Sequence, residues 1–257
     1  MKKYISASQI KLYMTCPVQY YHTYIDIKSV PFQENIYMVY GTAVHFALET
    51  YFKTYLKTKT RLTLDEVLKA FNKKFEEEMD RINVDMFSND TLIKSMYLAS
   101  ETTLNYYINK VAKNITPKAS EQVFEIKLKH YPIIIKGYID LITDEGYIID
   151  FKTVGKTWKK QYNDKSLSEN IQGALYAVAY RKMFKEKELG VRFDVMPRND
   201  NRVYLMEATI TDEYINYILE YATNMDKLNK QGVFVPNTSK CSQCPFKNIC
   251  KKQIIVK

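Results

Sequence analysis

The sequence lacks the features that mark membrane and secreted proteins. None of its apolar runs approaches the roughly 20 residues that a transmembrane helix needs. Its first residues, MKKYISASQI, contain no apolar core of a signal peptide. We therefore expect a cytoplasmic protein without a membrane partner. Internal repeats and low-complexity segments are absent as well, so we expect an ordinary folded globular protein.

Cysteines are few, and their spacing is uneven. The tail stretch CSQCPFKNIC has the spacing C-x2-C-x5-C, and one further cysteine lies far upstream. Disulfides are rare in a reducing compartment, so metal or cluster ligation is the better interpretation of such a set. Structural zinc sites usually take their ligands as two close pairs, and one distant cysteine with three close ones favours a 4Fe-4S cluster instead. Zinc and metal-free thiols are the alternatives. The candidate ligands are Cys16, Cys241, Cys244 and Cys250.

Positive charge and tyrosine are what the sequence has in excess. Lysine and arginine number 38 against 29 acidic residues, which gives a net charge of +9 and an isoelectric point near 9.1. This balance favours a polyanionic partner such as a nucleic acid, and the 22 tyrosines and 12 phenylalanines offer rings on which bases could stack. Scattered lysines also serve as a solubilising surface, so the net charge alone does not establish a nucleic-acid partner.

The periodicity of apolar residues divides the chain into helical and strand-forming parts. Up to about residue 117 the spacing is helical, with capping boxes at Ser6 and Thr63 and a break at Pro17. Beyond it the period falls to two, which predicts antiparallel hairpins. The strands are expected at residues 123–131, 132–143, 147–154, 191–196 and 202–210, a loop at 156–169, and helices at 167–184 and from Thr211 or Asp212 to Gly232.

This order of elements predicts an α/β (α+β) fold. A mixed central sheet would be flanked by helices, with a helical block ahead of it. We expect a single domain over residues 1–257, comprising an N-terminal helical part at 1–117, a core at 118–210 and a C-terminal helix with the cysteine tail at 211–257.

The stretch GYIIDFKTVGK, residues 146–156, ends a strand with two charges on one face. Asp150 and Lys152 are two residues apart, so their side chains are neighbours. The preceding hairpin turns near Glu145 and would bring Asp140 close to Asp150. Two converging carboxylates favour a bound Mg²⁺ or Mn²⁺ ion, and a lysine beside that ion suits phosphodiester hydrolysis. An ordinary structural ion pair is the alternative.

Four short motifs follow one another along the chain: GTAVHFALE at residues 41–49, GYID at 137–140, IIDFKT at 148–153 and QGALYAVAY at 172–180. In this order they resemble the PD-(D/E)XK nuclease superfamily and, within it, the RecB-like exonuclease branch. The cysteine arrangement is similar to the iron-sulfur staple of AddB-type helicase-nucleases and of CRISPR-associated exonucleases. The resemblance implies a restriction-endonuclease-like core and a cluster that ties the two ends of the chain together.

The resemblance also implies a set of metal ligands and a catalytic lysine. The metal ion would be held by the side chains of His45, Asp140 and Asp150, with the carbonyl oxygen of Phe151 completing the protein ligands. Lys152 would be the catalytic lysine. Without the motif His45 is an ordinary core histidine, so its role depends on the resemblance.

Three further residues would support the chemistry. Glu125 lies on the polar face of VFEIKL and would assist the metal ion or the water, although it could equally pair with a lysine. Gln172 and Tyr176 are four residues apart and share one helix face, where they would position the lysine or the scissile phosphate. As ordinary helix-surface residues they would have no such role.

Together these expectations describe a metal-dependent DNA exonuclease that uses Mg²⁺ or Mn²⁺ and carries a structural 4Fe-4S cluster. Single-stranded DNA or DNA ends are the expected substrates. A phosphate-binding loop G-x-x-x-x-G-K-[ST] is absent, so unwinding would need a helicase partner, and recombination or CRISPR partner proteins and an oligomer are compatible with the sequence. The alternatives are an inactive DNA-binding or assembly subunit and a structure-specific or RNA-directed endonuclease.

Overall fold

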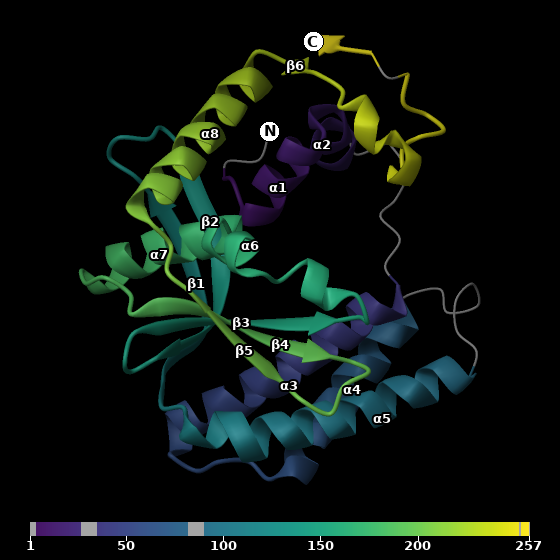
Figure 1. Cartoon of the computed structure of the whole chain (residues 1–257), viewed down its shortest axis with the longest axis vertical. Helices are drawn as coiled ribbons and strands as arrows, with labels where there is room; N and C mark the ends of the chain where they lie inside the picture. Colours follow the sequence, from purple (N-terminus) through teal and green to yellow (C-terminus); the bar gives the residue numbers. More distant parts are fainter. Residues whose placement is uncertain (1–3, 27–34, 82–89, 252, 257) are drawn as a thin grey trace.

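The computed structural model describes residues 4–26, 35–81, 90–251 and 253–256 (Figure 1). Its centre is a five-stranded sheet in the order β1-β2-β3-β4-β5. The β1–β2, β2–β3 and β4–β5 pairs are antiparallel and β3–β4 is parallel, so the sheet is mixed, as the sequence predicts. The strands are β1 (Pro117–Lys127), β2 (Ile134–Thr143), β3 (Tyr147–Val154), β4 (Gly190–Pro197) and β5 (Tyr204–Ala208).

One face of the sheet is covered by a layer of long helices, seen at the bottom of Figure 1. They are α3 (Ile36–Thr58), α4 (Leu64–Arg81) and α5 (Asp90–Tyr106), followed by a π-helical turn, Tyr107–Val111, and a short 3-10 turn, Ala112–Asn114. The expected capping box at α4 is confirmed: Glu66 accepts hydrogen bonds from the N–H and hydroxyl of Thr63 at 2.8 Å. Buried aromatic and aliphatic side chains of these helices pack on the sheet, which is the main stabilising term of this layer.

The opposite face carries helices from the beginning and from the second half of the chain. These are α1 (Ala7–Thr15), α2 (Pro17–Tyr24), α7 (Ile171–Phe184) and α8 (Asp212–Lys230). Ser6 and Thr211 are the N-caps of α1 and α8, as expected from the sequence. No helix in the described ranges is both long and apolar enough to span a membrane.

Shorter elements join these layers. The stretch predicted as a loop at residues 156–169 contains a 3-10 turn, Trp158–Lys160, and the short helix α6 (Asp164–Ser168), which Asn163 caps. After α8 the chain forms β6 (Val233–Phe234), a 3-10 turn, Thr238–Gln243, and β7 (Ile255–Val256). This last segment lies beside α2 at the top of Figure 1, so the two ends of the described chain meet.

Alternation along β2 and β3 distributes the core between the two layers. Ile148 packs with the α1 and α7 side, whereas Ile149 packs with the α3 side. The register of β2 and β3 pairs Leu141 with Ile149 and Ile142 with Ile148. Continued by one residue, it sets Asp140 opposite Asp150, which is the arrangement that the hairpin turn predicts.

Asp194 is a fully buried carboxylate that links the sheet to the helical layer. It accepts two hydrogen bonds from Arg192 at 2.7 and 3.0 Å and one from the hydroxyl of Tyr107 at 2.6 Å. Burial raises the pKa of Asp194 above its usual value, and the arginine opposes that shift. This cluster holds the π-helical turn against β4.

Candidate active site

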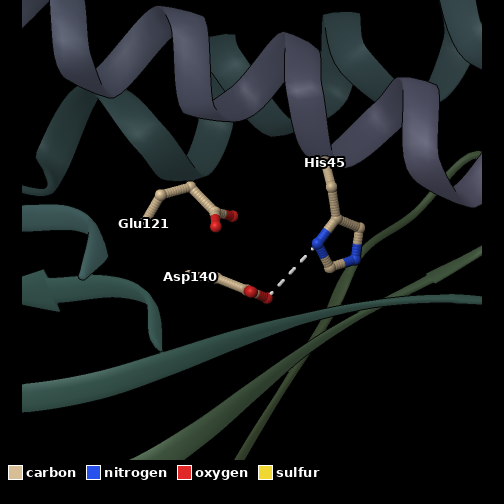
Figure 2. Close-up of side chains that lie close together, drawn as sticks. All are labelled: His45, Glu121 and Asp140. Carbon is tan, nitrogen blue, oxygen red and sulfur yellow. Dashed lines mark ion pairs between the residues drawn. The ribbon is translucent and has the colours of Figure 1, made fainter. Parts of the chain in front are cut away.

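Three side chains from three different elements converge above the sheet (Figure 2). His45 comes from α3, Glu121 from β1 and Asp140 from β2, and each offers a ligand atom within 4.8 Å of the others. Within the described ranges this is the one group of three or more histidine, cysteine or acidic side chains that approach so closely. An imidazole nitrogen and two carboxylates are a donor set for a divalent cation.

His45 is held over Asp140 by packing and by an ion pair. Its ring lies edge-on against Phe151 at 5.8 Å between centroids, and its Nδ1 atom is 3.4 Å from Oδ2 of Asp140. Burial opposes protonation of His45, but the Asp140 carboxylate outweighs it and raises the pKa of the imidazole. In α3 the residue one turn earlier is Gly41, where an added Cβ would lie 2.9 Å from Oγ1 of Thr153. The missing side chain thus lets the helix approach the end of β3.

Asp140 is fixed by the neighbouring strand. The backbone N–H of Phe151 donates a hydrogen bond to Oδ2 of Asp140 at 2.7 Å. Burial favours the neutral acid, but His45, Lys152 and this hydrogen bond stabilise the carboxylate, so the pKa of Asp140 lies below its usual value. The aspartate is therefore ionised and ready to bind a cation. The side chain of Phe151 itself is buried in the core on the α3 side.

Glu121 occupies the place that the sequence analysis gave to Glu125. It adopts a left-handed backbone conformation with φ of 49°, which breaks the alternation of β1 at this point. Burial, with Asp140 and Glu49 nearby, raises the pKa of Glu121 to about 7. Such crowding of carboxylates is what a bound cation would relieve.

The expectation for Glu125 needs a correction. Its side chain is 57% exposed and pairs with Lys136 across the strand at 3.2 Å, so the structure does not bring it to His45 and Asp140. Sequence reasoning missed Glu121 because the predicted strand began at residue 123, whereas β1 begins at Pro117. No periodic signal would have marked a residue at an irregular position.

A second network adjoins the first from the other side of β3. The Nζ atom of Lys152 lies 2.5 Å from Oδ2 of Asp150 and donates to Oε1 of Gln172 at 2.9 Å. The amide of Gln172 donates to the hydroxyl of Tyr176, and that hydroxyl donates to Oδ1 of Asp150 at 3.3 Å. These four residues, predicted together, form a closed ring.

Burial controls the charges in this ring. Burial raises the pKa of Asp150 above its usual value, although Lys152 opposes the shift. Burial also disfavours the charged form of Lys152, but Asp150 outweighs it and raises the pKa of the ammonium. Oδ2 of Asp150 is buried and accepts no hydrogen bond of good geometry from the described residues, so its ion pair leaves ligand capacity for a cation.

Three hollows open around these residues. One follows α3 and is lined in part by Tyr37, Gly41, His45 and Glu121. A second, beside α1 and β2, reaches Asp140, and a third, beside α1 and α6, reaches Lys152. The candidate site is thus open to a ligand from both sides of β3.

The four cysteines line one pocket where the two ends of the chain meet. Cys16 lies between α1 and α2, and its Sγ accepts the backbone N–H of Asn237 at 3.3 Å. Burial raises the pKa of the Cys244 thiol, and the other three cysteines add to the shift. In the described ranges no three of the sulfur atoms lie within 4.8 Å of one another, so the structure does not show the expected iron-sulfur staple.

Comparison with known proteins assigns the family. The model of the PD-(D/E)XK nuclease superfamily matches residues 4–251. The chain belongs to the PD-(D/E)XK nuclease superfamily. Divalent metal ions are typical cofactors of PD-(D/E)XK nucleases, and DNA is the substrate that the family implies. The group formed by His45, Glu121 and Asp140 is the candidate site for such an ion.

One solved structure shares the fold of this chain. A candidate exonuclease from Eubacterium rectale superposes with a TM-score of 0.63 at 15% identity, covering 98% of this PD-(D/E)XK chain and 90% of that one. A second structure, that of SSO0001, gives a TM-score of 0.36 at 17% identity, covering 89% of this chain and 92% of that chain. No curated protein sequence matches the chain.

Proposed function

We propose that this PD-(D/E)XK nuclease is a metal-dependent DNA exonuclease. The observation that carries the proposal is that two groups adjoin. The candidate cation ligands His45, Glu121 and Asp140 lie together, and Asp140 accepts a hydrogen bond from the N–H of Phe151, the residue between Asp150 and Lys152. An inactive site would have no physical reason to keep Glu121 crowded by other carboxylates and Asp150 buried beside Lys152. This favours an active enzyme over an inactive DNA-binding subunit.

The ligand atoms suit Mg²⁺ or Mn²⁺, because they are hard oxygens joined by one imidazole. Asp140, Asp150, His45 and Glu121 would hold the ion, and the carbonyl of Phe151 is proposed as a further ligand. When bound, the ion acts as a Lewis acid toward the phosphate and lowers the pKa of bound water. It would also balance the repulsion between the carboxylates.

Lys152 would act directly on the reacting groups. Gln172 and Asp150 fix its ammonium, and the raised pKa keeps it protonated, so it can donate hydrogen bonds to a phosphate oxygen as negative charge develops. Tyr176 and Gln172 are positioning residues, since both reach the reacting centre through Lys152 and Asp150.

Single-stranded DNA or DNA ends are the proposed substrates, in line with the resemblance to the RecB-like and CRISPR-associated branch. The net charge of +9 supports a polyanionic substrate. The test compares linear and circular single-stranded DNA of the same sequence with Mg²⁺ or Mn²⁺. Degradation of the linear strand alone supports an exonuclease. Cleavage of both would indicate an endonuclease with the same site, and cleavage of neither would contradict a nuclease function.

We further propose that the cysteine pocket holds a structural 4Fe-4S cluster. Four thiols from both ends of the chain face one pocket, and their mutual repulsion as thiolates would be relieved by iron. One distant cysteine with three close ones favours a cluster over zinc, because structural zinc sites usually take their ligands as two close pairs.

The test is protein purified without oxygen. We expect iron and inorganic sulfide in equal amounts and a brown colour that Cys244→Ser removes together with thermal stability. Zinc without iron, or a variant whose spectrum is unchanged, would contradict the cluster.

A further inference from the structure

Arg198 is a partly buried cation that has no acidic partner among the described residues. It follows β4 directly and is partly buried, and burial lowers the pKa of its guanidinium. Within the described ranges its guanidinium has no carboxylate in an ion pair and no hydrogen-bond acceptor, unlike Arg181 with Glu188 or Arg192 with Asp194. Desolvating a charge is costly unless it finds a counter-charge, so the donors of Arg198 are available to an anion.

Aromatic rings hold the guanidinium in place. Its Cζ atom lies 4.3 Å from the ring centroid of Tyr37 and 6.0 Å from that of Tyr40, and its backbone N–H donates to the carbonyl of Val154 at 3.0 Å. Stacking fixes the plane of the group while leaving its edge donors unused. A planar fork of this kind matches two oxygens of a phosphate.

This arginine is linked through Tyr37 to the hollow that follows α3. Tyr37, Gly41, His45 and Glu49 recur every fourth residue, so they form one stripe of the helix, and all four line that hollow. Tyr37, which carries Arg198 on its ring, is 45% exposed. The hollow therefore connects the stacked pair with the candidate metal group at His45.

Arg198 differs from the other charges near this stripe. Glu49, beyond His45, is paired with Lys53, and Lys74, which also lines the hollow, is paired with Glu78. Arg198, stacked on Tyr37, has no carboxylate partner among the described residues, so its guanidinium is available to a phosphate. Tyr37 and His45 are eight residues apart, which is about 12 Å along a helix, or roughly the rise of three to four stacked nucleotides at about 3.4 Å each.

We propose that Arg198, stacked on Tyr37, binds a phosphate of the nucleic-acid strand roughly three to four nucleotides from the scissile bond, and so sets the length of strand that the site holds. The inference rests on the proposed nuclease function. Tyr37, with its face partly exposed, stacks a base beside that phosphate.

The experiment uses labelled oligothymidylates of roughly two and roughly eight nucleotides, since single-strand sites usually span about 4–16 nucleotides. Binding is measured by fluorescence anisotropy in EDTA over a salt series, and cleavage is measured separately with Mn²⁺. The variants are Arg198→Ala, Arg198→Lys and Tyr37→Ala. Arg202→Ala is the control, because it removes the same charge from an exposed position nearby.

For Arg198→Ala we expect roughly tenfold weaker binding of the longer strand, as for the loss of one charge-assisted contact, and a salt slope smaller by about 0.7. KM should rise with kcat nearly unchanged, and the shorter strand should be unaffected. Arg198→Lys should restore part of the affinity, and Arg202→Ala should match the wild type.

Equal losses for both lengths, together with a lower melting temperature, would show that Arg198 only clamps α3 and overturn the proposal. Unchanged affinity and salt slope would overturn it as well. If Arg198→Ala does not fold, Arg198→Lys and Tyr37→Ala test the proposal instead: weaker binding of the longer strand alone supports it, and equal losses for both lengths contradict it.

The binding assay also separates this inference from the proposed function. A wild type that cleaves, with variants that bind as it does, contradicts the inference alone. A wild type that binds the longer strand through Arg198 but never cleaves contradicts only the nuclease proposal. Absence of both binding and cleavage contradicts both.

Discussion

His45 on α3 and Asp140 on β2 meet across the boundary between the helical layer and the sheet, with Nδ1 of His45 3.4 Å from Oδ2 of Asp140. The contact depends on elements that are remote in sequence, namely the hairpin that carries Asp140 and the helix whose Gly41 permits a close approach. The contact between His45 and Asp140 thus joins the helical layer to the sheet at the candidate site.

Glu121→Gln should weaken binding of Mn²⁺, whereas Glu125→Gln should not. Glu121 lies with His45 and Asp140, but Glu125 pairs with Lys136 at the surface. Mutation of a residue that only supports a metal ligand costs roughly 10- to 100-fold in metal affinity, so loss of a direct carboxylate ligand should cost at least as much. Isothermal titration calorimetry with both variants measures this. Equal affinities for the two variants would show that Glu121 is not a ligand.

Tyr176→Phe should lower kcat about tenfold while preserving the fold, because it removes the hydroxyl that bonds Gln172 and Asp150 but keeps the buried ring. Tyr180→Phe, one turn further along α7, is the matched control, since its hydroxyl bonds Glu186 away from the site. KM should stay constant in both variants. A Tyr176→Phe enzyme with full kcat would mean that the hydrogen bonds of the Tyr176 hydroxyl do not help to position Lys152.

Gly137→Ala should destabilise the protein by about 1–3 kcal/mol. An added Cβ would lie 2.7 Å from Cζ of Phe124, whose ring is buried and packs edge-on against Tyr176 at 6.1 Å. The ring of Phe124 must then shift. Denaturant unfolding measures the change in the free energy of unfolding, and an unchanged midpoint would show that Phe124 adapts without loss.

Arg192→Met should be far more destabilising, by about 3–5 kcal/mol, because Asp194 would remain buried without its counter-charge. The double variant Arg192→Met with Asp194→Leu should recover much of the loss, since it also removes the charge. Thermal and denaturant unfolding test both proteins. A double variant no more stable than the single one would contradict this account of the cluster.

Much of this arrangement follows from local sequence signals. Short stretches of sequence predict the helix caps at Ser6, Thr63 and Thr211. The position of the hairpin turn near Glu145 predicts that Asp140 lies opposite Asp150. Gln172 and Tyr176 could be placed together because helical spacing puts them on one face.

Other features depend on tertiary contacts that no local pattern records. Glu121 lies where β1 departs from regular alternation, so periodicity gave the position to Glu125. The stacking of Arg198 on Tyr37 joins a turn after β4 to the first turn of α3. Glu121 and Arg198 belong to no sequence motif, and only the packing of the layers brings Glu121 to His45 and Arg198 to Tyr37.

The most direct test of the central claim is cleavage of end-labelled linear single-stranded DNA by the wild type and by Lys152→Ala, each with Mg²⁺, Mn²⁺ or EDTA. The wild type should cleave only with metal, and Lys152→Ala should be slower by at least about a hundredfold with nearly unchanged affinity for Mn²⁺, because the lysine acts mainly in the transition state. A Lys152→Ala protein as active as the wild type, or a wild type inactive with either metal, would reduce the Asp150–Lys152 contact to a structural ion pair.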